Sequence, residues 1–280
     1  MRPDQVVAAR RQAPVVFVPV GPLEWHGPHM PLGTDGLHAW HVSVRAARRV
    51  GGVVLPALFA GTDGLRPPGD GPESLGALGL DDDAEVFGMD FPTFPVKSVY
   101  LEEGVFGALV RGVVQALKRD AYRLIVLANG HGATNQQRTL TEIARGETAL
   151  PDVRVLHANV WVPPEPPQLD PGHAERAEAA VMLALDGNGV RLEELPAADP
   201  LRYREYGIVD GPAFDGDPTP DRTVRPEADP RRATRQEGER ILAREVERMA
   251  ELVREELEAL VALGADELEA RHGSGRGASS

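Results

Sequence analysis

Residues 15–27 read VVFVPVGPLEWHG, and this stretch decides the fold class of the 280-residue chain. Its first six residues are apolar and mostly β-branched, and they stop at Gly21-Pro22, which predicts a short strand buried on both faces. Glu24 and His26 follow at once, so polar side chains stand where the strand ends. Buried strands of this kind are typical of parallel sheets, whose functional groups gather beyond the carboxyl ends of the strands.

Strands and helices are expected to alternate along the rest of the chain. Further apolar, strand-like runs occupy residues 53–60, 123–130 and 153–160. Helical patterns, with apolar residues every three or four positions, cover residues 37–50, 104–119, 134–145 and 174–185. This alternation predicts an α/β fold: a single three-layer domain with a mostly parallel sheet and helices on both faces.

One domain is expected to span residues 1–263. Residues 61–98 are rich in Gly, Pro and Asp and form an insertion, and residues 195–231 are Pro- and Asp-rich again. Such long loops are either lids, binding loops and oligomer contacts, or solvated insertions without chemistry. Residues 236–263 predict an amphipathic helix that packs on its own domain, with pairing to a second subunit as the alternative. Residues 264–280 are expected to be a flexible tail.

Composition excludes several classes of protein. The chain has 30 Lys and Arg against 43 Asp and Glu, a net charge of −13, which argues against nucleic acid or an anionic membrane as a partner. It has no cysteine, so disulfides, thiolate catalysis and Cys-based metal sites are excluded. No run approaches the roughly 20 apolar residues of a membrane span, and we expect a cytoplasmic protein without a signal peptide.

Histidines and carboxylates cluster at the predicted strand ends. After the first strand, Glu24 and His26 stand two positions apart in LEWH, so their side chains point the same way in an extended backbone. After the strand at 123–130, the turn NGHG presents a histidine between two glycines. Three strand ends can bring five such residues together above one edge of the sheet: Glu24, His26, Asp35, His131 and Glu178.

Two imidazoles and three carboxylates suit a pair of divalent ions such as zinc or manganese. One carboxylate would bridge the ions, and a water molecule or hydroxide would complete the pair. Each residue alone has a plainer interpretation: a histidine at a strand end is usually a satisfied polar group, and Glu24 or Asp35 could be a helix cap or a salt-bridge partner. The combination at consecutive strand ends favours the metal site.

Three segments carry a resemblance to a known family. GPLEWHGPHMPLGTD, LANGHGATN and GHAERAE resemble, in this order, the signature segments of the creatininase (creatinine amidohydrolase) family over about residues 14–186. The resemblance implies a compact α/β fold, two divalent metal ions per chain (zinc or manganese, with iron as a further option), a small-molecule substrate and a homo-oligomer such as a hexamer. It implies hydrolysis in which hydroxide held by the metals attacks a carbonyl.

The resemblance also implies roles for individual residues. By motif position, Glu24 and His131 would hold one metal, His26 and Glu178 the other, and Asp35 would bridge them. His173, at the head of the third motif, would be the catalytic residue that handles protons beside the substrate. His29 would lie next to the ligands without binding a metal itself. The histidines at 38 and 41 are interpreted as helix-face residues.

Departures from the family pattern bear on the substrate. Creatinine-cleaving members carry a further glutamate where this chain has Ala133, and a tryptophan over the substrate where it has Leu169. Trp25 replaces the usual glutamine of the first motif. We therefore expect a small cyclic amide or related polar substrate rather than creatinine. In the third motif Arg176 is either a surface residue or a contact for an anionic substrate.

Other functions stay open at this point. A ring-opening hydrolase of an inosose-type cyclic ketone would use the same metal chemistry. A metal-free relic scaffold with a binding role would explain the altered third motif. A phosphate-binding enzyme is disfavoured, because neither a P-loop nor a GxGxxG fingerprint follows a predicted strand.

Overall fold

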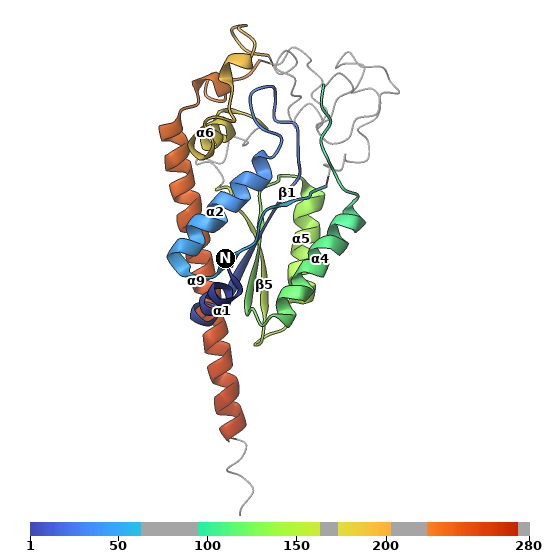
Figure 1. Ribbon diagram of the computed structural model, residues 1–280, viewed down its shortest axis with the longest axis vertical. Helices are drawn as coiled ribbons and strands as arrows, with labels where there is room; N and C mark the ends of the chain where they lie inside the picture. Colours follow the sequence, from blue (N-terminus) through green and yellow to red (C-terminus); the bar gives the residue numbers. More distant parts are fainter. Residues whose placement is uncertain (63–94, 163–172, 203–222, 274–280) are drawn as a thin grey trace, which may run out of the picture.

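A computed structural model describes residues 1–62, 95–162, 173–202 and 223–273, with side chains as far as residue 263 (Figure 1). In chain order the elements are α1 (Pro3–Gln12), β1 (Val15–Gly21), α2 (Thr34–Val50), β2 (Val53–Val54), β3 (Leu58–Phe59), α4 (Glu103–Arg119), β4 (Leu124–Asn129), α5 (Thr134–Glu147), β5 (Arg154–Asn159), α6 (Arg176–Leu185), the short 3-10 helices η1 (Leu192–Glu194) and η2 (Pro230–Arg232), and α9 (Arg235–Gly273). Within the described ranges, no helix has the length and hydropathy that a membrane span requires.

The strands form a parallel sheet with the order β2-β1-β4-β5. β3 also pairs with β1, further along that strand, so the predicted strand at 53–60 is in fact two short strands. The break falls at Pro56, which has no N–H to donate to a neighbouring strand. Because all strands run the same way, the residues that follow β1 and β4 lie at one edge of the sheet.

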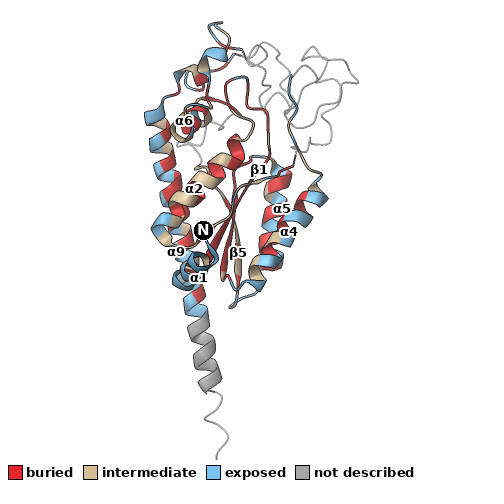
Figure 2. Ribbon diagram, viewed as in Figure 1, coloured by how far each residue is buried: buried red, intermediate tan, exposed pale blue. Residues whose placement is uncertain are grey.

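Helices cover both faces of the sheet, which confirms the three-layer α/β prediction. Side chains of β1 and β4 alternate between the faces: Phe17 and Val126 pack with α2 and α9, whereas Val18 and Ile125 pack with α4 and α5. The buried faces of these helices are turned towards the sheet (Figure 2). A third apolar cluster, around Met182 of α6, closes the end of the molecule near the loop between β1 and α2 (residues 22–33), which we call the first-motif loop.

The C-terminal helix α9 packs on its own chain, as the amphipathic pattern predicts. Leu242, Val246, Met249 and Val253 are buried in the core cluster shared with α2 and β1. The helix ends later than predicted: residues 264–273 continue it, because GADELEARHG is mostly composed of good helix formers. The rest of the predicted tail lies outside the described residues, as do most of the insertion at 61–98 and much of the segment at 195–231.

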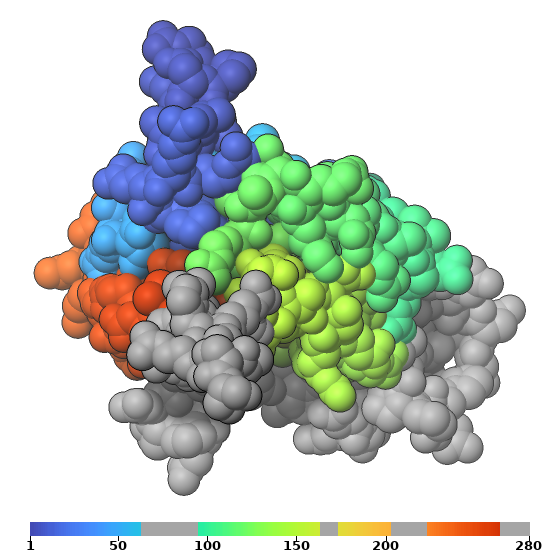
Figure 3. Space-filling view, turned by 90° about the horizontal axis from the view of Figure 1, so that it is seen from below, coloured from blue at the N-terminus to red at the C-terminus, as the bar shows by residue number. Residues whose placement is uncertain are grey.

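Helix α1 projects from the molecule beside the end of the sheet at which β1 begins (Figure 3). Arg10 donates a hydrogen bond to the main-chain oxygen of Asp120 over 2.6 Å, and its guanidinium lies 5.6 Å from the ring centre of Tyr122. This end carries none of the predicted site residues. Tyr122 is therefore a buried tyrosine remote from the chemistry.

A buried ion pair links α2 to α9. His38 Nε2 lies 2.7 Å from Glu245 Oε2, and the whole Glu245 residue is 3% exposed. Burial lowers the pKa of His38, but Glu245, assisted by Glu178 and Asp35, outweighs burial and raises it above its ordinary value. The pair therefore stabilises the packing of α9 while His38 is protonated.

Glu245→Gln is expected to lower the free energy of unfolding of the chelator-treated protein by about 1–3 kcal/mol at pH 6. The stabilisation from a raised histidine pKa is full below the unfolded value, near 6.5, and is lost as pH rises through the folded value. The loss measured by urea unfolding should therefore shrink between pH 6 and pH 9. Glu251→Gln, an exposed change on the same helix, is the control. A difference that does not vary with pH would contradict this account.

Candidate metal centre

The loop after β1 folds back on itself and buries two of the predicted ligands. The main-chain N–H of Glu24 donates to Leu32 O over 2.8 Å. His26 Nδ1 donates to the main-chain oxygen of Glu24 over 3.0 Å, and both side chains are almost fully buried. As their spacing predicts, the two point the same way, with His26 Nε2 3.8 Å from Glu24 Oε2.

Asp35 lies in the first turn of α2, which begins earlier than predicted. Two glycines let the strand ends approach this turn closely. A Cβ atom on Gly130 would lie 2.1 Å from the main-chain oxygen of Asp35, and one on Gly21 would lie 2.6 Å from Asp35 Cβ. The glycine before the histidine in the NGHG turn is thus required by space, because any side chain would displace Asp35.

His131 is aimed by its own turn and by a segment distant in sequence. Asn129 Nδ2 donates to the main-chain oxygen of His131 over 2.8 Å, which holds the turn. His131 Nε2 lies 2.9 Å from the main-chain oxygen of Thr62 and, because a carbonyl only accepts, donates to it. His131 Nδ1 therefore faces the carboxylates, 3.0 Å from Asp35 Oδ2 and 3.4 Å from Glu24 Oε2.

The third motif brings His173 and Glu178 to the same place. His173 Nε2 donates to the main-chain oxygen of Trp25 over 2.6 Å, and its Nδ1 lies 3.7 Å from Glu24 Oε2. Ala174 adopts a left-handed φ of 56° and donates its N–H to Glu178 Oε2 over 2.5 Å. This sharp turn places both residues of the motif at the sheet edge.

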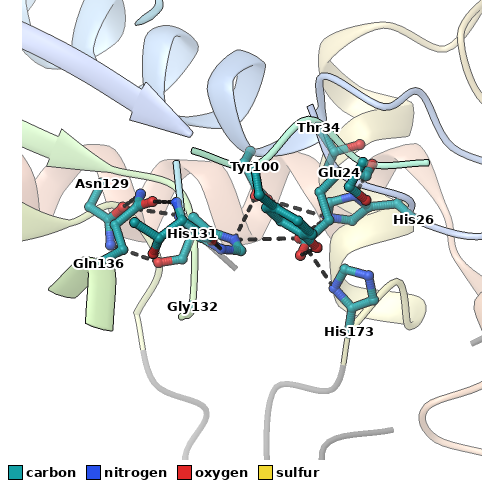
Figure 4. A network of polar contacts seen from close by, with 12 residues as sticks. Glu24, His26, Thr34, Tyr100, Asn129, His131, Gly132, Gln136 and His173 are labelled. Atoms are coloured by element: carbon teal, nitrogen blue, oxygen red, sulfur yellow. Dashed lines mark hydrogen bonds and ion pairs between the residues drawn. The ribbon is translucent and has the colours of Figure 1, made fainter. Parts of the chain in front are cut away.

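The predicted residues come together as overlapping sets of possible ligands, and Figure 4 shows four of them, Glu24, His26, His131 and His173, near one another. In each set the donor atoms lie within 4.8 Å of one another: Glu24, Asp35 and His131; His26, Asp35 and Glu178; and Glu24, His26 and His173. The first two sets share Asp35, in the division that the motif resemblance implies. The structure thus assembles a metal-binding cluster, and the role of each residue in it remains a prediction.

The electrostatics of the cluster favour positive charge. Burial raises the pKa of the Glu24 carboxyl, but His131 and His173 outweigh it and hold that pKa at about 2. Burial lowers the pKa of His26, but Asp35, Glu178 and Glu24 raise it to about 10. Without a metal, protons on the imidazoles would thus balance the carboxylates.

Two buried atoms of the cluster point to a cation. Among the described residues His26 Nε2 and Asp35 Oδ2 make no well-aligned hydrogen bond, although His26 Nε2 lies 3.2 Å from Asp35 Oδ1 and Asp35 Oδ2 lies 3.0 Å from His131 Nδ1. His26, His131 and His173 each donate one ring N–H to a main-chain oxygen, which turns the other nitrogen towards carboxylate oxygens. Such nitrogen and oxygen donors fit a divalent ion such as zinc or manganese.

Comparison with known proteins identifies the family. The creatininase profile, described as creatinine amidohydrolase, matches residues 1–69 and 87–253. This chain belongs to the creatininase family. It is 26% identical over 262 residues to creatinine amidohydrolase from Pseudomonas putida, covering 86% of this chain and 89% of that protein. It is 29% identical over 256 residues to the mycofactocin precursor peptide peptidase of Mycolicibacterium smegmatis, covering 86% and 85%.

Solved creatininases share the fold. A crystal structure of creatinine amidohydrolase superposes with a TM-score of 0.61 at 24% identity, covering 91% of this chain and 95% of that one. Similar structures include creatininases described as a Zn-Zn type and as a Mn form. The protein is thus a creatininase-family hydrolase with a metal-binding residue cluster.

Some contacts at the centre have no counterpart in the sequence prediction. Tyr100 Oη donates to Glu24 Oε1 over 2.6 Å, and Thr62 holds His131 through its main chain. A lone tyrosine beyond a long insertion carries no spacing signal, and a main-chain contact leaves none in side-chain identity. The sequence left Arg176 open between a surface residue and a contact for an anionic substrate. Its ion pair with Glu237 of α9, over 3.0 Å, favours the first of these.

Proposed function

We propose that this protein is a binuclear metal-dependent hydrolase that cleaves a C–N bond in a small cyclic amide or a related polar substrate other than creatinine. The observation that carries the proposal is the sharing of Asp35 between two sets of donor atoms. A buried carboxylate flanked by two imidazoles, His26 at 3.2 Å and His131 at 3.0 Å, has the position of a bridging ligand.

Glu24, Asp35 and His131 would hold one ion, and His26, Asp35 and Glu178 the other. Two such ions, when bound, polarise a carbonyl and lower the pKa of a water molecule enough to make it a nucleophile near neutral pH. The buried position of Glu24, His26, Asp35 and His131 strengthens these interactions by keeping bulk water away.

His173 is suited to move a proton between the nucleophile and the leaving nitrogen. Its Nε2–H is committed to the main-chain oxygen of Trp25, so Nδ1 carries the lone pair and faces the cluster. An imidazole fixed in this tautomer accepts a proton at Nδ1 and can return it to a departing amine. The hydrogen bond to Trp25 also keeps the ring from turning.

Two features support a substrate other than creatinine. Ala133 puts a methyl group beside the NGHG turn, where the resemblance places a glutamate in creatinine-cleaving members. The tryptophan expected over the substrate is also replaced, by Leu169, which lies outside the described residues. Both changes remove groups that would contact a bound ring.

A peptide amide is the second candidate substrate. Its support is the 29% identity to a precursor peptide peptidase, a relative that covers this chain as fully as the creatinine amidohydrolase does. Lactams, formamides, short peptides and inosose-type cyclic ketones, tested side by side with zinc or manganese, would separate these chemistries. Ring opening of a ketone alone would replace the cyclic-amide proposal with the C–C hydrolase alternative.

Metal content is the decisive measurement. Purified protein dialysed against buffer is expected to retain about two equivalents of divalent metal by elemental analysis. His26→Ala should retain clearly less, because it removes an imidazole from one set of donors. His157→Ala, a half-buried histidine of β5, serves as the matched control. Near-zero metal in the parent after reconstitution with zinc or manganese would contradict the metal-dependent hydrolase proposal and favour the metal-free relic scaffold.

A further inference from the structure

The segment that returns from the insertion is anchored against the first-motif loop. Ser98 Oγ accepts a hydrogen bond from the main-chain N–H of Trp25 over 2.9 Å. Val99 N–H donates to Leu23 O over 2.7 Å, and Leu101 N–H donates to Gly61 O over 2.8 Å. The backbone on both sides of Tyr100 is thus held in place.

This anchoring delivers a phenol to one oxygen of a predicted ligand. Tyr100 Oη donates to Glu24 Oε1 over 2.6 Å, and the Tyr100 ring centre lies 6.3 Å from that of His131 (Figure 4). The other oxygen, Oε2, faces the imidazoles: it lies 3.4 Å from His131 Nδ1 and 3.8 Å from His26 Nε2. The two oxygens of Glu24 therefore have different surroundings.

We infer that Tyr100 is a positioning residue that makes Glu24 a one-oxygen ligand. A carboxylate can bind a metal through one oxygen or through both, and a short hydrogen bond from a phenol occupies Oε1. With Oε2 alone on the ion, one coordination position stays open, as a hydrolytic site needs for water or substrate. This inference rests on the proposed function.

Charge and burial agree with this role. Tyr100 Oη lies 2.6 Å from Glu24 Oε1, a distance typical of a charge-assisted hydrogen bond from a hydroxyl to a carboxylate. Glu24 is 3% exposed, so water cannot readily replace the hydroxyl if it is removed. Without the hydroxyl, Glu24 Oε1 would either lie without a hydrogen-bond partner or turn towards the metal and bind it.

Tyr100→Phe tests the inference, with Tyr122→Phe as the matched control at the remote end of the molecule. By chelator competition with zinc, Tyr100→Phe is expected to bind one of its two ions about 10–100-fold more weakly than the parent, the usual cost of losing a partner of a metal ligand. The affinity for the other ion, and both affinities of Tyr122→Phe, should stay within about threefold.

Cobalt(II) provides a second measurement that reports the ligand arrangement directly. Cobalt absorbs visible light more strongly with four ligands than with five or six, so a Glu24 that turns both oxygens onto the metal should weaken the band. Unchanged zinc affinities together with an unchanged cobalt spectrum in Tyr100→Phe would overturn the inference. A parent protein that binds neither metal would instead overturn the proposed function, which keeps the two failures distinct.

Discussion

Asp35→Asn is expected to abolish retention of both metal ions and to lower kcat/KM by about a thousandfold or more for any substrate that the parent hydrolyses. Asp35 is the one residue shared by the two predicted ligand sets, so both would lose a charged donor at once. An amide of the same shape is a poor ligand, and it leaves His26 and His131 without the carboxylate that lies 3.2 and 3.0 Å away.

Elemental analysis after dialysis and a steady-state assay with added manganese would measure these effects. Asp152→Asn, an exposed aspartate in the turn before β5, is the matched control and should behave like the parent. A variant that keeps both ions would show that Asp35 does not bridge them. A variant that loses the metals but remains fully active would remove the metals from the mechanism.

His173→Gln is expected to lower kcat by about 10²–10⁴-fold while both ions stay bound. The glutamine can still donate to Trp25 O, which His173 Nε2 contacts over 2.6 Å, but it has no basic nitrogen to carry a proton. The expected separation of activity from metal content distinguishes this residue from His26 and His131, whose loss should reduce both.

The same elemental analysis, with kcat measured across pH, would test this role. His157→Gln, a second half-buried histidine near the sheet edge, serves as the control and should leave kcat unchanged within about threefold. Loss of metal together with activity in His173→Gln would make His173 a ligand, in line with the set that it forms with Glu24 and His26.

Most of the architecture was predictable because it depends on local patterns. The apolar runs before Gly21 and Gly130 are short and end at glycine, which predicts strands covered on both faces, and the alternation with helices implied a parallel sheet. Element ends were less predictable. The break at Pro56 is local chemistry that a continuous apolar run conceals, and α2 begins early because the first motif leads directly into its first turn, which carries Asp35.

The sequence by itself determined which residues could reach the centre, because parallel strands deliver the residues after β1 and β4 to one edge. Only the tertiary structure decided how they meet there. The close approach of Gly130 to Asp35, and the main-chain oxygens that set the ring tautomers of His26, His131 and His173, depend on backbone positions rather than side-chain identity. Tyr100 reaches Glu24 from 76 residues away, a contact that no periodicity or spacing encodes.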